Sequence, residues 1–203
     1  MRIVKDRVRA GFTLLELLIV ISVVAVLASI VIASLPGIMA NIKRKSIRQF
    51  VAELEAGLED YKQDNAIYPL NPEGGGASGS SKVDDGVAVQ GAVILYKHLS
   101  GDFDMDGQGT VDDDMTIYVE RLDNWSNRER NGRKPGQERS APFQGGYAVV
   151  DPLGGPVRYV AFPPNMKNKP TRNPTYDMWS VAGADAEHPD FSDEAKWITN
   201  WGN

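Results

Sequence analysis

The stretch "RAGFTLLELLIVISVVAVL" at residues 9–27 decides how the chain is organised. It opens an apolar run that extends from Phe12 to Leu35 and contains one ionisable side chain, Glu16. A helix over these 24 residues rises about 36 Å, which is enough to cross a bilayer core of about 30 Å with some tilt. The run therefore predicts a transmembrane helix. It also leaves a carboxylate to be explained at a depth where charges are costly.

The charge of the chain differs on the two sides of residue 11. Residues 1–11 have a net charge of +3, whereas the rest of the chain has 18 basic and 26 acidic residues, a net of −8. An acidic soluble part argues against nucleic acid as the main partner. The absence of cysteine excludes a disulfide framework and a thiolate metal site.

No motif in the sequence points to catalysis. The chain has no G-x-S-x-G or P-loop pattern, and its glycine run at 74–79, although it fits G-x-G-x-x-G, lies in a Ser/Gly-rich loop with no strand before it. Its two histidines, His98 and His188, have neither H-E-x-x-H spacing nor cysteine neighbours, so a zinc site is not expected. We therefore predict that the protein is not an enzyme.

A basic segment followed by an apolar run admits more than one interpretation. A secretory signal could be cut after Ala33, within "VIAS". However, the apolar run is longer than the roughly 7 to 15 residues of such signals, and Glu16 would lie inside it. An uncut membrane anchor is the second interpretation, and it leaves Glu16 unexplained. The third depends on the junction between the basic and apolar segments.

The junction "GFTLLE", Gly11 to Glu16, resembles the processing site of type IV prepilins and type II secretion pseudopilins. The resemblance implies that a prepilin peptidase cuts after Gly11 and that the new terminal residue, Phe12, is N-methylated. It also implies that Glu16 of one subunit meets the Phe12 amine of the next and sets the register during filament assembly. The alternative is a glutamate near the membrane face that snorkels to water.

Beyond Pro36 and Gly37, the apolar residues follow one face of a helix, which predicts an amphipathic helix that stops near Asn65. The residues of this stripe are Ile47, Phe50, Val51, Leu54, Leu58 and Tyr61. The basic residues at 43–48 are interpreted as a headgroup-contacting or solvated face.

The remaining sequence predicts short elements. Residues 91–101 read as a short helix, "TIYVERL" at 116–122 as a strand, "GGYAVVDPLGGPVRYVAF" at 145–162 as a hairpin, and "YDMWSVAGAD" at 176–185 as the last strand. The predicted class is α+β, with a long N-terminal helix packed on a small antiparallel sheet. The predicted parts are a cleaved leader (1–11), a transmembrane helix (12–35), an amphipathic segment (36–69) and a globular domain (70–203) with an insertion at 71–144.

Several blocks of sequence extend the resemblance. Residues 61–69, 151–160, 176–185 and 198–201 are similar, in that order, to the major pseudopilin of type II secretion. The resemblance implies a structural subunit of a pseudopilus, assembled with its own copies and other pseudopilins by an inner-membrane platform. It further implies a single-pass protein held in inner-membrane lipid, with its C-terminal domain in the periplasm. Two alternatives stay open: a type IV pilus subunit for adhesion, motility or DNA uptake, and a membrane-anchored calcium-dependent binding protein that never polymerises.

The insertion contains a candidate calcium site, "DFDMDGQGTVDD" at 102–113. Its spacing is that of a loop that wraps oxygen ligands around Ca²⁺, although the following "MTIYV" reads as strand rather than helix. We expect a single EF-like loop with an affinity of about 10⁻⁴ to 10⁻³ M; the alternative is a solvated turn. The candidate ligands are Asp102, Asp104 and Asp106, the Gln108 carbonyl, Thr110 and Asp113.

The resembled family also binds calcium in its C-terminal loop, which corresponds here to "GADAEHPDFSDEAKW" at 183–197. Asp185 matches the family's "GAD". The glycines and the acidic residue expected before "ITNW" are missing, so Asp190 and Asp193 complete a second candidate site only by their position in the loop.

Overall fold

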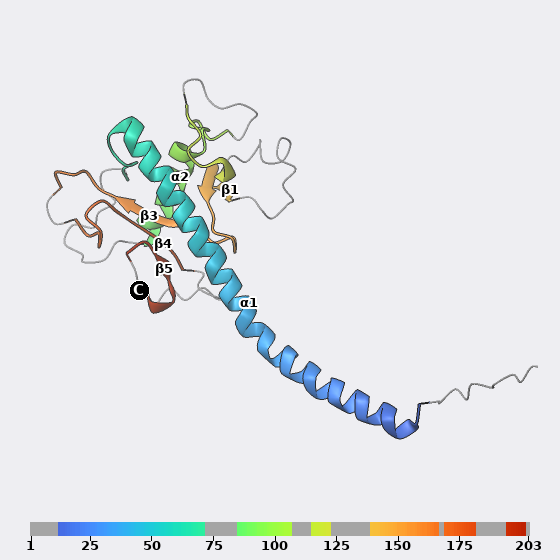
Figure 1. The fold of residues 1–203 in the computed structure, drawn as a ribbon. Helices are drawn as coiled ribbons and strands as arrows, with labels where there is room; N and C mark the ends of the chain where they lie inside the picture. The colour runs from blue at the N-terminus through green and yellow to red at the C-terminus, as the bar shows by residue number, and fades with distance from the viewer. Residues whose placement is uncertain are drawn as a thin grey trace, which may run out of the picture. The chain divides into compact units, whose positions relative to one another are not determined.

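The computed structural model describes residues 12–71, 85–106, 115–122, 139–166, 169–181 and 194–201. The chain divides into two units, Met1–Ala40 and Asn41–Asn203. Helix α1, Leu14–Asn65, begins in the first unit and continues into the second (Figure 1). Among the described residues it is the one helix whose length and composition would allow it to cross a membrane, and its most apolar window has a mean hydropathy of 3.0.

The first unit contains only the apolar half of α1 among its described residues. Every described side chain from Phe12 to Met39 is exposed, including large apolar ones such as Leu15 at 69% and Ile32 at 66%. A run of exposed Leu, Ile and Val on all sides of a helix has no protein surface to bury it, which is the pattern of a segment solvated by lipid. The predicted apolar helix is therefore present.

The second half of α1 carries the predicted stripe. Ile47, Leu54 and Leu58 are fully buried, so this face of the helix forms part of the core. The helix ends at Asn65, as its pattern predicts, because Ala66 takes the left-handed conformation (φ 65°) that often closes a helix. The backbone N–H of Ala66 donates to the Lys62 carbonyl at 2.8 Å.

Helix α2, Asp85–Leu99, packs on strands β2 and β3. Its close approach to β3 depends on Gly91, since a Cβ at this position would lie 1.9 Å from the Tyr159 carbonyl oxygen. After α2 the chain passes through η1, Glu120–Leu122, a single turn of 3-10 helix. The predicted strand at 116–122 is therefore wrong: the N–H groups of Tyr118 and Val119 both donate to the Leu99 carbonyl, which holds this segment against the end of α2 instead of in a sheet.

The strands form two small antiparallel sheets. One pairs β1, Ser140–Phe143, with β2, Gly146–Val149, and the other has the order β3-β4-β5, with β3 at Arg158–Ala161, β4 at Tyr176–Ser180 and β5 at Ile198–Thr199. The predicted α+β class is confirmed. The predicted hairpin at 145–162 is wrong in its pairing, because β2 pairs with β1 and not with β3. The two sides of the predicted turn are joined only by the isolated bridge between Val150 and Pro156.

The core of the second unit lies on both faces of the β3-β4 pair. Side chains of successive strand residues point to opposite faces, so Tyr159 and Met178 join the larger cluster with the stripe of α1, while Val160 and Trp179 join a smaller one. All buried residues of both clusters lie between Ile47 and Ile198. The second unit therefore contains a complete core without any residue of the first.

Candidate assembly and metal-binding sites

The first site is the start of α1, where Thr13 and Glu16 bond to each other. The Thr13 N–H donates to Glu16 Oε2, and the Glu16 N–H donates to Thr13 Oγ1, each at 3.2 Å. This reciprocal pair is a capping box, which satisfies two of the N–H groups that a helix start leaves without partners. Sequence reasoning missed this role, although the spacing of threonine and glutamate in "TLLE" is its usual signal.

Glu16 keeps capacity for a further partner. Both Phe12 and Glu16 are exposed, and no lysine or arginine among the described residues lies within ion-pair distance of the Glu16 carboxylate. A carboxylate has about four acceptor positions, and the Thr13 N–H and hydroxyl occupy Oε2 alone. The cap therefore leaves room for an ammonium group. Gly11 lies outside the described residues, so cleavage after it stays a prediction.

The second site is the acidic loop that follows α2. The structure brings Asp102, Asp104 and Asp106 together, with one oxygen of each within 4.8 Å of the others. The Asp106 N–H donates to Asp102 Oδ1 at 3.1 Å and to Asp104 Oδ1 at 3.0 Å, which folds the loop around the three carboxylates. The other candidate ligands, Gln108, Thr110 and Asp113, lie outside the described residues.

Asp102 is the fixed member of this group. Its side chain is buried, and Oδ2 accepts a hydrogen bond from the Tyr96 hydroxyl at 2.7 Å. Burial and this hydrogen bond raise the pKa of Tyr96, so the hydroxyl stays protonated as a donor. Asp104 and Asp106 are exposed. The arrangement holds one carboxylate rigidly and leaves two at the surface, where a cation could reach them.

The aromatic ring of Phe103 connects this loop to His98. The two rings meet edge to face at 5.6 Å between centroids, and His98 Nδ1 lies 3.2 Å from the Tyr61 hydroxyl. Burial and the neighbouring Lys97 lower the pKa of His98, so the imidazole is neutral at pH 7. His98 therefore adds no positive charge beside the three carboxylates.

The predicted second calcium site cannot be placed, because Asp185, Asp190 and Asp193 lie outside the described residues. The segments on either side of them are held together by aromatic contacts. Trp179 of β4 stacks on Trp197 at 5.9 Å between centroids and meets Trp201 edge to face at 5.6 Å.

A cleft of about 380 Å³ lies between α1 and the C-terminal segment, lined by Arg48, Val51, Ala52, Glu55 and residues 197–200. Partial burial and the neighbouring Glu59 raise the pKa of Glu55.

Comparison with known proteins matches residues 6–32 to the family described as "Prokaryotic N-terminal methylation motif". The chain is also similar to type II secretion system core protein G of several bacteria. It is 44% identical to that of Dickeya chrysanthemi over 73 residues, which are 36% of this chain and 47% of the relative. It is 45% identical to that of Escherichia coli over 65 residues, 32% of this chain and 44% of the relative.

These matches cover about half the length of the relatives. A more distant match extends further: core protein G of Pseudomonas aeruginosa is 23% identical over 197 residues, which are 97% of this chain and 98% of the relative. No solved structure matches the chain. The resemblance to type IV pilin-like proteins, and within them to the major pseudopilin of type II secretion, is confirmed.

Proposed function

We propose that the chain is a pseudopilin, a filament subunit of a type II secretion system. The observation that carries the proposal is the coincidence of two features: the methylation motif at 6–32 covers the start of an apolar helix whose side chains find no protein surface to bury them. The relatives named core protein G favour secretion over a type IV pilus used for adhesion, motility or DNA uptake. A calcium-binding anchor that never polymerises would have no use for the motif.

Processing is the first step of the proposed function. Prepilin peptidase would cut between Gly11 and Phe12, remove the basic leader and leave a positive amine at the start of the helix. Mass spectrometry of the N-terminus from cells tests this step. A chain that begins with N-methylated Phe12 is the expected result. A chain that begins at Ser34 would identify an ordinary secretory signal and overturn the proposal.

Assembly is the second step. Glu16 would accept the Phe12 amine of a neighbouring subunit while its bonds to Thr13 stay in place, because the cap uses only part of the carboxylate's capacity. An ion pair away from water is strong and directional, so it would fix the register of adjacent helices. The apolar halves of α1 would bundle at the centre of the filament, and the acidic globular units would surround them.

The proposed partners follow from these steps. They are further copies of the chain, other pseudopilins, the prepilin peptidase and the inner-membrane assembly platform. The protein would cross the inner membrane once, in contact with its lipid, with residues beyond α1's apolar half in the periplasm. Its work would be mechanical rather than enzymatic: polymerisation would push secreted proteins toward the outer membrane.

We also propose that the loop at 102–113 binds Ca²⁺. Hard oxygen ligands suit this cation, and three carboxylates held this close repel one another unless a cation is present. The hydrogen bond from Tyr96 fixes Asp102 before any cation arrives. Asp104 and Asp106, which are exposed, would close on the ion with ligands further along the loop. The second candidate site, at Asp185, Asp190 and Asp193, is proposed from the family resemblance alone.

A further inference from the structure

We propose that a basic collar, defined as Lys43, Arg44, Lys45 and Arg48, binds the phosphate groups of anionic phospholipids on the periplasmic face of the inner membrane. The inference rests on the proposed membrane anchoring and adds a lipid class, a binding surface and an orientation for the globular unit.

The collar is spread over an arc of about 200°, more than half of the helix circumference. Successive helical residues are turned by about 100°, so Lys43, Arg44 and Lys45 point in three different directions, and Arg48 lies between the last two. None of the four is buried, although Ile47, which lies among them in sequence, belongs to the core. A docking face for one protein partner would occupy one side of the helix. Cations spread over about 200° suit a surface broader than one docking face, as a layer of headgroups is.

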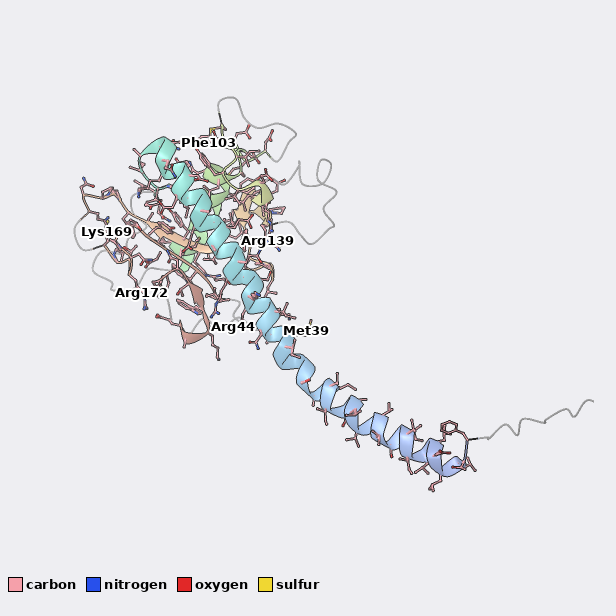
Figure 2. The ribbon with its side chains drawn as sticks, in the orientation of Figure 1. Met39, Arg44, Phe103, Arg139, Lys169 and Arg172 are labelled. Carbon is pink, nitrogen blue, oxygen red and sulfur yellow. The ribbon has the colours of Figure 1, made fainter. Side chains whose placement is uncertain are left out.

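The charges of the collar form no ion pair within the part of the chain that the structure describes. Among the described residues, no carboxylate lies within ion-pair distance of any of the four side chains. Arg44 donates to the Lys196 carbonyl at 3.2 Å, which brings the C-terminal segment, with the exposed side chain of Lys196, beside the collar (Figure 2). A carbonyl leaves the charge of the guanidinium uncompensated, so Arg44 still attracts an anion.

The dimensions of the collar match those of a headgroup layer. Its four residues span about 7.5 Å along the helix axis, and the polar layer on each side of a bilayer core is roughly 5–8 Å thick. The 32 residues from Phe12 to Lys43 place these two residues about 46 Å apart along a helix, close to the 40–45 Å of a whole bilayer. A helix that starts at the cytoplasmic headgroups therefore reaches the opposite headgroups at the collar.

The charge of the remaining unit gives the contact a direction. Beyond Arg48 the chain has 14 basic and 25 acidic residues, a net of −11. An anionic membrane attracts the collar and repels the rest of the unit, so the two effects favour the same orientation. Glu55 lines the same cleft as Arg48, and its carboxylate would keep a phosphate at the Arg48 end of that cleft.

The test compares two lipids and two triple variants. The chain from Phe12 onward, without the basic leader, is supplied in detergent micelles with phosphatidylglycerol or phosphatidylcholine, and retained lipids are counted by native mass spectrometry. The collar variant is Arg44→Gln/Lys45→Gln/Arg48→Gln. The matched control, Lys62→Gln/Lys97→Gln/Lys169→Gln, removes the same charge elsewhere in the second unit. We expect the wild type and the control to retain phosphatidylglycerol preferentially, and the collar variant to lose that preference.

A second measurement uses residues 41–203, whose core is complete without the first unit. Each basic residue near an anionic surface raises partitioning roughly fivefold, so the collar variant should bind vesicles containing phosphatidylglycerol about 100-fold more weakly than the wild type. The difference should shrink in 0.5 M salt. Vesicles of phosphatidylcholine alone should bind neither protein.

Four results would overturn the proposal. Equal retention of both lipids by the wild type would show that it has no preference for phosphatidylglycerol. An equal loss of that preference in the control variant would show that it depends on net charge and not on the collar. Full competition by millimolar glycerol phosphate would mean a site for free phosphate. A collar variant that keeps its lipid but loses self-association in sedimentation velocity would assign the collar to a second copy of the chain. The proposed pseudopilin function is judged separately, by the methylated Phe12.

Discussion

Substitutions at Thr13 and Glu16 separate the helix cap from the charge. Thr13→Ala removes the hydroxyl that accepts the Glu16 N–H at 3.2 Å, which costs about 1 kcal/mol at a helix start and raises fraying about fivefold. Glu16→Gln keeps an amide oxygen that can accept the Thr13 N–H, since glutamine also serves in capping boxes. It removes only the charge. Glu16→Ala removes both.

Loss of the charge should damage assembly far more than loss of the cap. If Glu16 pairs with the Phe12 amine of a neighbour, its removal leaves that amine buried and unpaired. Such a loss costs about 3–5 kcal/mol, or roughly 10²- to 4 × 10³-fold in affinity per subunit contact. We therefore expect Glu16→Gln and Glu16→Ala to abolish filaments alike, while Thr13→Ala lowers their yield about fivefold at most.

The assay measures three quantities for each variant in cells. Alkaline extraction reports membrane insertion, the mass of the N-terminus reports cleavage, and sheared filaments are counted by immunoblot and electron microscopy. All variants should insert and be cleaved. Filaments of Glu16→Gln at the level of Thr13→Ala would refute the reasoning, because the carboxylate would then matter only as a cap.

Three further predictions concern the globular unit. Calorimetric titration should show Ca²⁺ binding that Asp102→Ala/Asp106→Ala abolishes and the exposed control Asp60→Ala keeps. With a dissociation constant near 10⁻³ M, 10 mM Ca²⁺ should add about 1.4 kcal/mol to the free energy of unfolding, and equal binding by the double variant would exclude this loop. Gly91→Ala should lower the free energy of unfolding of the unit, measured in urea, by about 1–3 kcal/mol, because the new Cβ would lie 1.9 Å from the Tyr159 carbonyl oxygen. An unchanged urea midpoint would contradict that contact. Burial, with the charge of Glu59, raises the pKa of Glu55 above 4.5 in the folded state, so folding is favoured by protonation and loses stability as pH rises through that range. Glu55→Gln should therefore raise the melting temperature at pH 7 but not at pH 4, and an equal change at both would disprove the linkage.

Local patterns in the sequence predicted α1 well. Its apolar half can be predicted from composition alone. Its buried stripe and its end at Asn65 can be predicted from helical periodicity, which does not depend on residues far away in the sequence. The three aspartates at 102, 104 and 106 converge as predicted because they are close in sequence. The remaining ligands and the C-terminal loop lie outside the described residues, so their predicted role stays a prediction.

Strand pairing was predicted less well because it depends on residues far apart in sequence. Strand β1 contains Pro142, which lacks an N–H and argues against a strand in the sequence, yet the residue is tolerated in a sheet of only two strands. The Pro-Leu-Gly-Gly turn exists, but Asp151 holds it: its carboxylate accepts from the N–H groups of Leu153 and Gly155. The apolar pattern in residues 116–122 comes from Val119, just before the 3-10 turn, and Leu122, within it, whose side chains both reach the core.

One helix supplies both the apolar segment and the first strip of the globular core, with no non-helical residue between them. Within the second unit, a pull along α1 therefore acts directly on Phe50, Leu54 and Leu58, because no linker separates the helix from the core. These side chains interlock with the core along the helix axis, so the load acts on them in shear and is shared by all of them at once. To draw α1 out of the second unit, all of these contacts would have to break together.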